Sequence, residues 1–176
     1  MIFKLSELLE ILKSNSKIAI IAPQLLNSDG SIQPSFGNFP SITTMIFYLS
    51  RLDKILPWGM VAHTNRNGDV VFPDWISGAC ILIKKEVFGK VGLFDEHYFM
   101  GIEDIDFCYR VRLASYGIMH ITRIKILHYH QYTSKKLNKK SMIIRTENRS
   151  LKYFYRKFYP KAMIRYYIFS FLVGAK

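Results

Sequence analysis

The feature that most restricts the fold is a short apolar run without polar alternation, KIAIIA at residues 17–22, which ends at Pro23. Its length, its β-branched residues and its lack of alternation predict a strand buried on both faces, as in a mostly parallel sheet. Leucines at helical spacing predict a helix before it, over residues 3–13. A second buried strand is expected over residues 75–83, followed by a short helix over residues 85–90.

The second half of the chain continues the alternation of helices and strands. Apolar spacing predicts a helix over residues 102–116, with Gly117 as its C′ glycine, and a strand over residues 118–128. A last helical region is expected from about Met142 onward, interrupted at Pro160. This order of elements predicts an α/β fold. Because the usual opening βαβ units and glycine-rich nucleotide motifs are missing, either the sheet is small or its first half is absent.

The charge of the chain changes sign along its length. Residues 1–106 carry 9 basic and 12 acidic side chains, whereas residues 107–176 carry 16 basic and one acidic, which gives a net charge of +12. A hydrophobic content of 49% supplies a core and argues against a disordered basic tail. The longest uncharged C-terminal stretch, residues 166–175, has about half the ~20 apolar residues of a membrane-spanning helix.

Other features of the sequence argue against export and against a disulfide or zinc framework. Glu7 and Glu10 lie where a secretory signal would have its apolar core. Cys80 and Cys108 have no nearby ligand cluster, which favours two small buried hydrophobic residues in a reducing compartment.

The densest acidic cluster is Glu103-Asp104-Ile105-Asp106, at the start of the helix predicted from Ile102. Two interpretations stay open. The acids could interact with the helix dipole, with an i,i+4 pair from Asp106 to Arg110. Alternatively, the aromatic, glycine-bounded segment before them could raise the proton affinity of a carboxylate and so tune a general base. The D-x-D spacing of Asp104 and Asp106 is not expected to bind a metal, because neighbours at i and i+2 on a helix diverge.

Two further clusters each have a structural and a functional interpretation. His128 and His130 lie two apart at a strand end, where they could be satisfied polar groups or could bind a metal together. The basic segment that follows could be a solvated loop or could contact a diphosphate through its lysines. These lysines are Lys135, Lys136, Lys139 and Lys140.

The last helical region carries a basic stripe beside a mostly apolar one. The basic stripe consists of Arg145, Arg149, Lys152 and Arg156, and the neighbouring stripe of Ile144, Asn148, Leu151, Tyr155 and Phe158. This pattern suits a helix at an anionic membrane surface, and it equally suits an amphipathic helix packed on its own domain. No nucleic-acid-binding module is recognisable, so no nucleic-acid partner is expected.

Several ordered motifs together resemble family 2 glycosyltransferases, especially rhamnosyltransferase-like members. They are APQLLNSDGSIQP at residues 22–34, WISGACILIKK at 75–85, VGLFDE at 91–96, Phe99, MGIEDIDFCYR at 100–110, and the strand ending in His128 with Ser134 shortly after. The resemblance covers roughly residues 2–161. It implies a partial nucleotide-diphospho-sugar transferase fold of the glycosyltransferase A type, with a mixed sheet flanked by helices. The implied reaction is inverting transfer of a sugar from a nucleoside-diphosphate donor to an acceptor hydroxyl.

The resemblance also implies roles for individual residues. The family's E-D pair falls on Glu103 and Asp104, which makes Asp104 the general base. Trp75 and the turn Ser77-Gly78-Ala79 would line the sugar and acceptor site. The late histidine of the family's site for a divalent metal, Mn²⁺ or Mg²⁺, falls on His128, with His130 as the alternative. Arg110, Lys135 and Lys136 are also expected to bind substrate.

The family's first half, which contains its metal-binding D-x-D, has no counterpart in this sequence. We therefore expect residues 1–140 to form the acceptor-side part of the domain and residues 141–176 to form a basic amphipathic helical tail. The chain could be a truncated reading frame or have a mis-called start, or a separate N-terminal half encoded by a split gene could supply donor binding. The expected partners are a nucleotide-sugar donor, a saccharide or lipid-linked acceptor in polysaccharide or glycolipid synthesis, and the anionic inner face of a membrane, at which the protein would be cytoplasmic and peripheral. The alternative is a non-catalytic remnant or a membrane- or partner-binding module.

Overall fold

A mixed four-stranded sheet forms the centre of the computed structural model, which describes residues 5–42, 62–63, 68–98, 102–129, 140–164 and 168. Its middle strands, β1 (Ile18–Leu26) and β7 (Gly117–Leu127), pair in parallel. The short edge strands are antiparallel to them, β4 (Val70–Val71) beside β7 and β6 (Leu82–Ile83) beside β1. The predicted α/β fold with a mixed sheet flanked by helices is confirmed.

A second, smaller sheet consists of three two-residue strands. β2 (Phe36–Gly37) lies between β3 (Ala62–His63) and β5 (Trp75–Ile76), and both pairings are antiparallel. Phe36 and Ile76 are almost completely buried, so this sheet extends the core between the main sheet and the helices.

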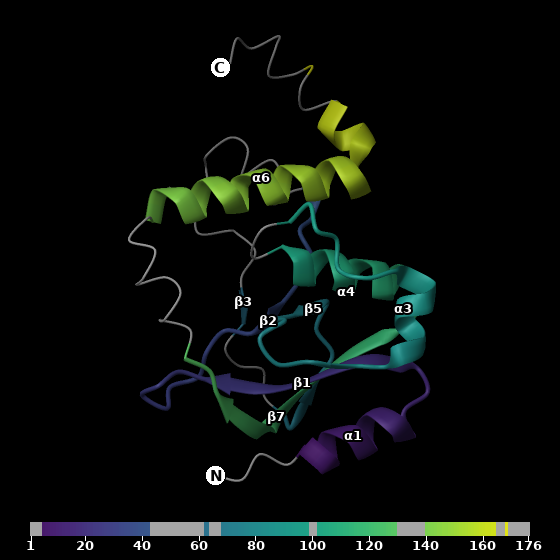
Figure 1. Ribbon diagram of the computed structural model, residues 1–176, viewed down its shortest axis with the longest axis vertical. Helices are drawn as coiled ribbons and strands as arrows, with labels where there is room; N and C mark the ends of the chain where they lie inside the picture. The colour runs from purple at the N-terminus through teal and green to yellow at the C-terminus, as the bar shows by residue number, and fades with distance from the viewer. Residues whose placement is uncertain are drawn as a thin grey trace.

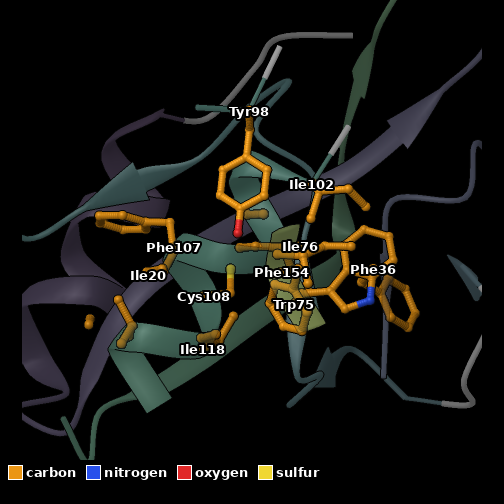
Figure 2. Close-up of a cluster of buried hydrophobic side chains, with 14 of the residues drawn as sticks. Ile20, Phe36, Trp75, Ile76, Tyr98, Ile102, Phe107, Cys108, Ile118 and Phe154 are labelled. Carbon is orange, nitrogen blue, oxygen red and sulfur yellow. The ribbon is translucent and has the colours of Figure 1, made fainter. Parts of the chain in front are cut away.

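The helices cover the two faces of the main sheet (Figure 1). α1 (Leu5–Ser14) covers one face, where Leu8 and Leu12 pack in a small core with residues of β1 and β7. α4 (Glu103–Leu113), flanked by α3 (Lys85–Val91), lies on the other side, and α6 (Lys140–Phe158) packs across α4. The main core lies between these layers, and Figure 2 shows residues from β1, β2, β5, α4, β7 and α6 meeting in it.

β1 differs from the prediction, which ended the strand at Pro23. The strand continues to Leu26, and every one of its residues is buried. Pro23 is accommodated because the pairing with β7 shifts register between Pro23 and Gln24, and an irregularity of this kind tolerates a residue without a backbone N–H. The expectation of a strand buried on both faces is confirmed.

The predicted single strand over residues 75–83 is wrong. The segment forms β5 and β6, which belong to different sheets and are separated by an exposed turn at Gly78 and Ala79. Residues 75–83 are mostly apolar because β5 is buried and β6 is partly buried, although they are two separate strands. The division of this segment into two strands places the turn at Gly78 and Ala79 beside the start of α4.

The predicted C′ role of Gly117 is also wrong. The left-handed residue after α4 is Ser115, with φ 64°, and Gly117 is the first residue of β7. A Cβ at Gly117 would lie 2.6 Å from Cδ1 of Ile18. The glycine is therefore explained by close packing of β7 against β1.

α6 is an integral layer of the domain. Leu151, Phe154 and Tyr155 are buried in the main core, whereas Lys152 and Arg156 are exposed. The helix is interrupted before Pro160, as predicted, and helical structure resumes over residues 160–164. Among the helices in the described ranges, none combines the length and apolar character needed to cross a membrane.

Candidate active site

The first turn of α4 places Asp104 beside the turn between β5 and β6. The backbone N–H of Gly78 donates to Oδ2 of Asp104 at 3.0 Å, and the N–H of Ile105 donates to Oδ1 at 2.8 Å. The start of the turn is fixed by Ser77, whose backbone N–H donates to the carbonyl of Ser35 at 2.7 Å. The structure thus brings together Asp104, Ser77, Gly78 and the exposed Ala79, four residues that the sequence analysis assigned to one site.

The environment of Asp104 suits a general base. Burial raises the pKa of Asp104 to about 7, and the nearby charge of Glu103 also raises it, while the N–H groups of Gly78 and Ile105 oppose this shift. A carboxylate whose pKa lies near neutral pH can take a proton from a hydroxyl and release it afterwards. The arrangement therefore fits the interpretation of Asp104 as a tuned base better than that of a solvated helix-dipole partner.

Glu103 provides an additional acceptor at the same place. Its side chain is partly buried, and its Oε2 atom lacks a hydrogen-bond partner among the described residues. A buried carboxylate oxygen without a hydrogen-bond donor is energetically costly, so this atom adds to the cost of ionising the first turn of α4.

Asp106 faces away from this site. It is fully buried, and its Oδ2 atom accepts a hydrogen bond from Nε of Arg110 at 2.7 Å, which confirms the predicted i,i+4 pair. Asp104 and Asp106 have entirely different hydrogen-bond partners, as expected for neighbours at i and i+2 on a helix. The remaining donors of Arg110 bind the carbonyls of Val91 and Leu93, so its proposed contact with substrate stays a prediction.

Trp75 lies in the main core and not on the surface of the turn. It is 9% exposed, and its indole N–H donates to the carbonyl of Asn38 at 2.9 Å. Figure 2 shows its ring among Phe36, Ile76 and Phe154. A contact between Trp75 and substrate stays a prediction, whereas its structural role is explained by this packing.

His128 directly follows β7 and lies at the carboxyl edge of the parallel pair. Its backbone N–H donates to the carbonyl of Leu26 at 2.8 Å, and its Nδ1 atom lies 3.1 Å from Oε1 of Gln33. In Figure 1, β1 and β7 end on the left, the side from which α4 starts. Ligands of α/β sheets commonly bind at this edge.

The divalent metal that the sequence analysis expected, with His128 as a ligand, stays a prediction. Within the described ranges, no three or more His, Cys, Asp or Glu side chains are grouped so that they could hold a metal ion. We therefore derive no catalytic step through a metal. The predictions for His130, Lys135 and Lys136 fall outside the described residues.

The sequence analysis missed a network of charged and tyrosine side chains that joins α6 to α4 and to the residues before α4. Lys157 of α6 contacts both Asp106 and Asp95, and Tyr98 and Tyr153 donate to the same two carboxylates. Tyr153 and Lys157 lie four residues apart on one face of the helix. That spacing was visible in the sequence, but their partners are about 50 to 60 residues away.

Comparison with known proteins gives a consistent class. No family model matches the chain. The chain is 31% identical over 117 residues to the N-acetylglucosaminyl-diphospho-decaprenol L-rhamnosyltransferase of Mycobacterium tuberculosis, a match that covers 65% of this chain and 38% of the relative. It is 34% identical over 62 residues to the rhamnosyltransferase WbbL of Escherichia coli, covering 35% and 24% of the two chains. It is 29% identical over 114 residues to a low-salt glycan biosynthesis hexosyltransferase of Haloferax volcanii, covering 65% and 34%.

These relatives are all glycosyltransferases, and the chain matches between about a quarter and two fifths of their length. The chain is therefore glycosyltransferase-like over about two thirds of its own length. The resemblance that the sequence motifs indicated is confirmed at this level.

Proposed function

We propose that this chain carries the acceptor-activating part of an inverting family 2 glycosyltransferase. The observation that supports this most directly is the hydrogen bond from Gly78 to Asp104, which holds a carboxylate with a pKa of about 7 against an exposed turn. A turn without a side chain at Gly78 leaves room for an acceptor hydroxyl to approach the carboxylate.

In the proposed reaction, Asp104 takes the proton of the acceptor hydroxyl as its oxygen attacks the anomeric carbon of the donor sugar. The new bond from this oxygen to the anomeric carbon forms while the bond to the nucleoside diphosphate breaks, and the diphosphate leaves with the bonding electrons. One displacement from the opposite face inverts the anomeric configuration. Glu103 assists this step through its charge, which raises the pKa of Asp104.

We propose a lipid-linked saccharide as the acceptor and a nucleoside-diphosphate deoxyhexose or hexose as the donor. The mycobacterial relative is named for transfer of L-rhamnose to a diphospho-decaprenol-linked N-acetylglucosamine, and the haloarchaeal relative for glycan biosynthesis. A role in polysaccharide or glycolipid assembly follows from these substrates.

We further propose that the protein works at the anionic cytoplasmic face of a membrane, in contact through the outer face of α6. Arg149, Lys152 and Arg156 are exposed there, while the apolar stripe of the helix is buried in the core. The contact is therefore mainly electrostatic, assisted by the exposed Ile164 and Ile168 that follow.

The decisive experiment compares Asp104→Asn with Glu86→Gln, which changes an exposed first-turn carboxylate of α3. Sugar transfer is measured with the full chain, alone and combined with the remainder of the mycobacterial relative. Asp104→Asn should lower transfer at least a hundredfold, while Glu86→Gln should retain it, as expected for loss of a general base. Transfer that survives in Asp104→Asn would exclude the base, and a wild-type chain without transfer in either setting would favour a non-catalytic binding module.

A further inference from the structure

Lys157 links α6 to the helix that carries the candidate base through two carboxylates. Its ammonium lies 2.7 Å from Oδ1 of the fully buried Asp106 on α4 and 2.7 Å from Oδ2 of Asp95 in the loop before α4. The hydroxyls of Tyr98 and Tyr153 donate to these same carboxylates, each at 3.1 Å. One ammonium thus joins α6, α4 and the loop.

The network satisfies both carboxylates. Asp106 receives Arg110 on its other oxygen, and the second oxygen of Asp95 receives the backbone N–H of His97 at 3.0 Å. Although burial alone would raise it, the hydrogen bond from Lys157 holds the pKa of Asp95 well below its usual range. Removing one partner from a buried charge cluster leaves the others uncompensated, so the loop should loosen without Lys157.

The contacts of this network lie on both sides of the candidate base. Tyr98 precedes the Glu103-Asp104 pair by a few residues, and Asp106 follows it within the same helical turn. The body of α6 is held independently, because Leu151 and Phe154 are buried in the main core. Loss of the ammonium should therefore disturb the start of α4 more than the attachment of α6.

We propose that Lys157 is a positioning residue that, from the C-terminal helix, fixes the loop before α4 and so keeps Asp104 in its water-poor, reactive placement. This inference rests on the proposed function of Asp104. Within the described part of the chain, Lys157 donates to Asp106 and Asp95 and not to Asp104, so it acts on the base through these two carboxylates.

The test compares Lys157→Met, which keeps the apolar stem, with Lys157→Arg, which restores the charge. Lys161→Met, which changes an exposed lysine in the helical segment that follows α6, is the matched control. The titration midpoint of Asp104 is measured by carboxyl ¹³C NMR, and kcat and acceptor KM are measured by sugar transfer. Glu103 and Cys108 interact electrostatically with Asp104, and the N–H of Gly78 donates to it. None of the variants changes these groups, so a shift of the midpoint reports the loss of Lys157.

The sign of the titration shift separates the explanations. Positioning predicts that Lys157→Met admits water and lowers the midpoint of Asp104 by about half a pH unit or more, whereas mere loss of a positive charge would raise it. For Lys157→Met we expect kcat to fall about tenfold with little change in KM, since misplacement of Asp104 acts on the chemical step. Lys157→Arg should recover most of the wild-type kcat and titration midpoint. A midpoint that is unchanged or raised in folded Lys157→Met would overturn the proposal.

A milder variant covers the case in which Lys157→Met does not fold. Tyr153→Phe removes only the hydroxyl that donates to Asp95 and should give a smaller shift in the same direction, and an unshifted midpoint would again overturn the proposal. Because the NMR titration requires no turnover, it tests the positioning of Asp104 even if sugar transfer is absent. If the midpoint of Asp104 is lowered in Lys157→Met but neither the wild type nor any variant transfers sugar, the proposed function is contradicted and the positioning role of Lys157 is supported.

Discussion

The amide of Gly78 and the carboxylate of Asp104, 26 residues apart in the chain, meet at 3.0 Å and join the turn between β5 and β6 to the first turn of α4. The contact places an exposed backbone turn against a carboxylate that burial keeps partly protonated near neutral pH. This pair combines the candidate base with an exposed turn beside it.

Asp104→Asn should stabilise the fold at and above neutral pH. Because burial raises the pKa of Asp104 in the folded state, that state binds more protons than the unfolded chain between about pH 4 and 7, and stability falls as pH rises through this range. Asn cannot ionise and removes this cost. We expect a gain on the order of 1 kcal/mol at pH 8, a value reduced for partial exposure, that disappears near pH 4.

Urea unfolding of wild type and Asp104→Asn at several pH values measures this difference, with Glu86→Gln as the control that should show no such trend. A variant that is less stable than wild type at pH 8 would show that the ionised carboxylate is stabilising in place, contrary to its raised pKa.

Gly78→Ala should impair acceptor binding and leave the fold intact. A Cβ at Gly78 would lie 3.7 Å from Cβ of Asp104, which is an ordinary van der Waals contact, and the backbone there does not require a glycine. We expect stability within about 0.5 kcal/mol of wild type. The added methyl group narrows the approach to the carboxylate, so acceptor KM should rise severalfold in a sugar-transfer assay. An unchanged KM would place the acceptor elsewhere.

Two glycines near the end of α3 should respond in opposite ways to alanine. Gly89 lies within the helix with open space at its Cβ, so Gly89→Ala should stabilise the protein by about 0.5–1 kcal/mol. Gly92 has φ 78° and ψ −177°, a conformation that is essentially restricted to glycine, so Gly92→Ala should cost about 1–3 kcal/mol. Thermal unfolding of both variants measures this contrast, and two changes of the same sign would contradict the backbone geometry after α3.

Neutralising the outer face of α6 should release the protein from anionic vesicles. Each basic group near such a surface contributes about 1 kcal/mol, so a triple change of Arg149, Lys152 and Arg156 to Gln should lower binding at least tenfold in a flotation assay. Binding should also weaken with added salt.

A matched triple variant tests whether this effect is local. Lys13, Lys17 and Lys85 are exposed elsewhere, and changing them to Gln removes the same charge. If both triple variants lose binding equally, net charge and not the face of α6 accounts for the attraction.

Local patterns in the sequence were sufficient for most of the elements. The spacing of leucines predicted α1, the apolar run predicted the buried part of β1, and the acidic cluster marked the start of α4. Such signals are local because hydrogen bonding and side-chain periodicity within an element depend on near neighbours. The family motifs likewise placed Asp104 and the turn at Gly78 in one site, and the structure brings these two residues together.

Only the tertiary structure decided how the 75–83 segment divides, why Gly117 is a glycine, and what Lys157 does. β5 and β6 separate because each pairs within a different sheet, and a Cβ at Gly117 would lie 2.6 Å from the side chain of Ile18. In the sequence, Lys157 is one more basic residue of a basic helix. In the structure, its ammonium contacts two carboxylates that lie 51 and 62 residues away in the chain. The sequence by itself determined most of the elements and indicated which residues form the candidate site. Burial and contacts between distant segments determined the proton affinity of Asp104 and the network around Lys157, because both depend on which groups exclude water once the chain has folded.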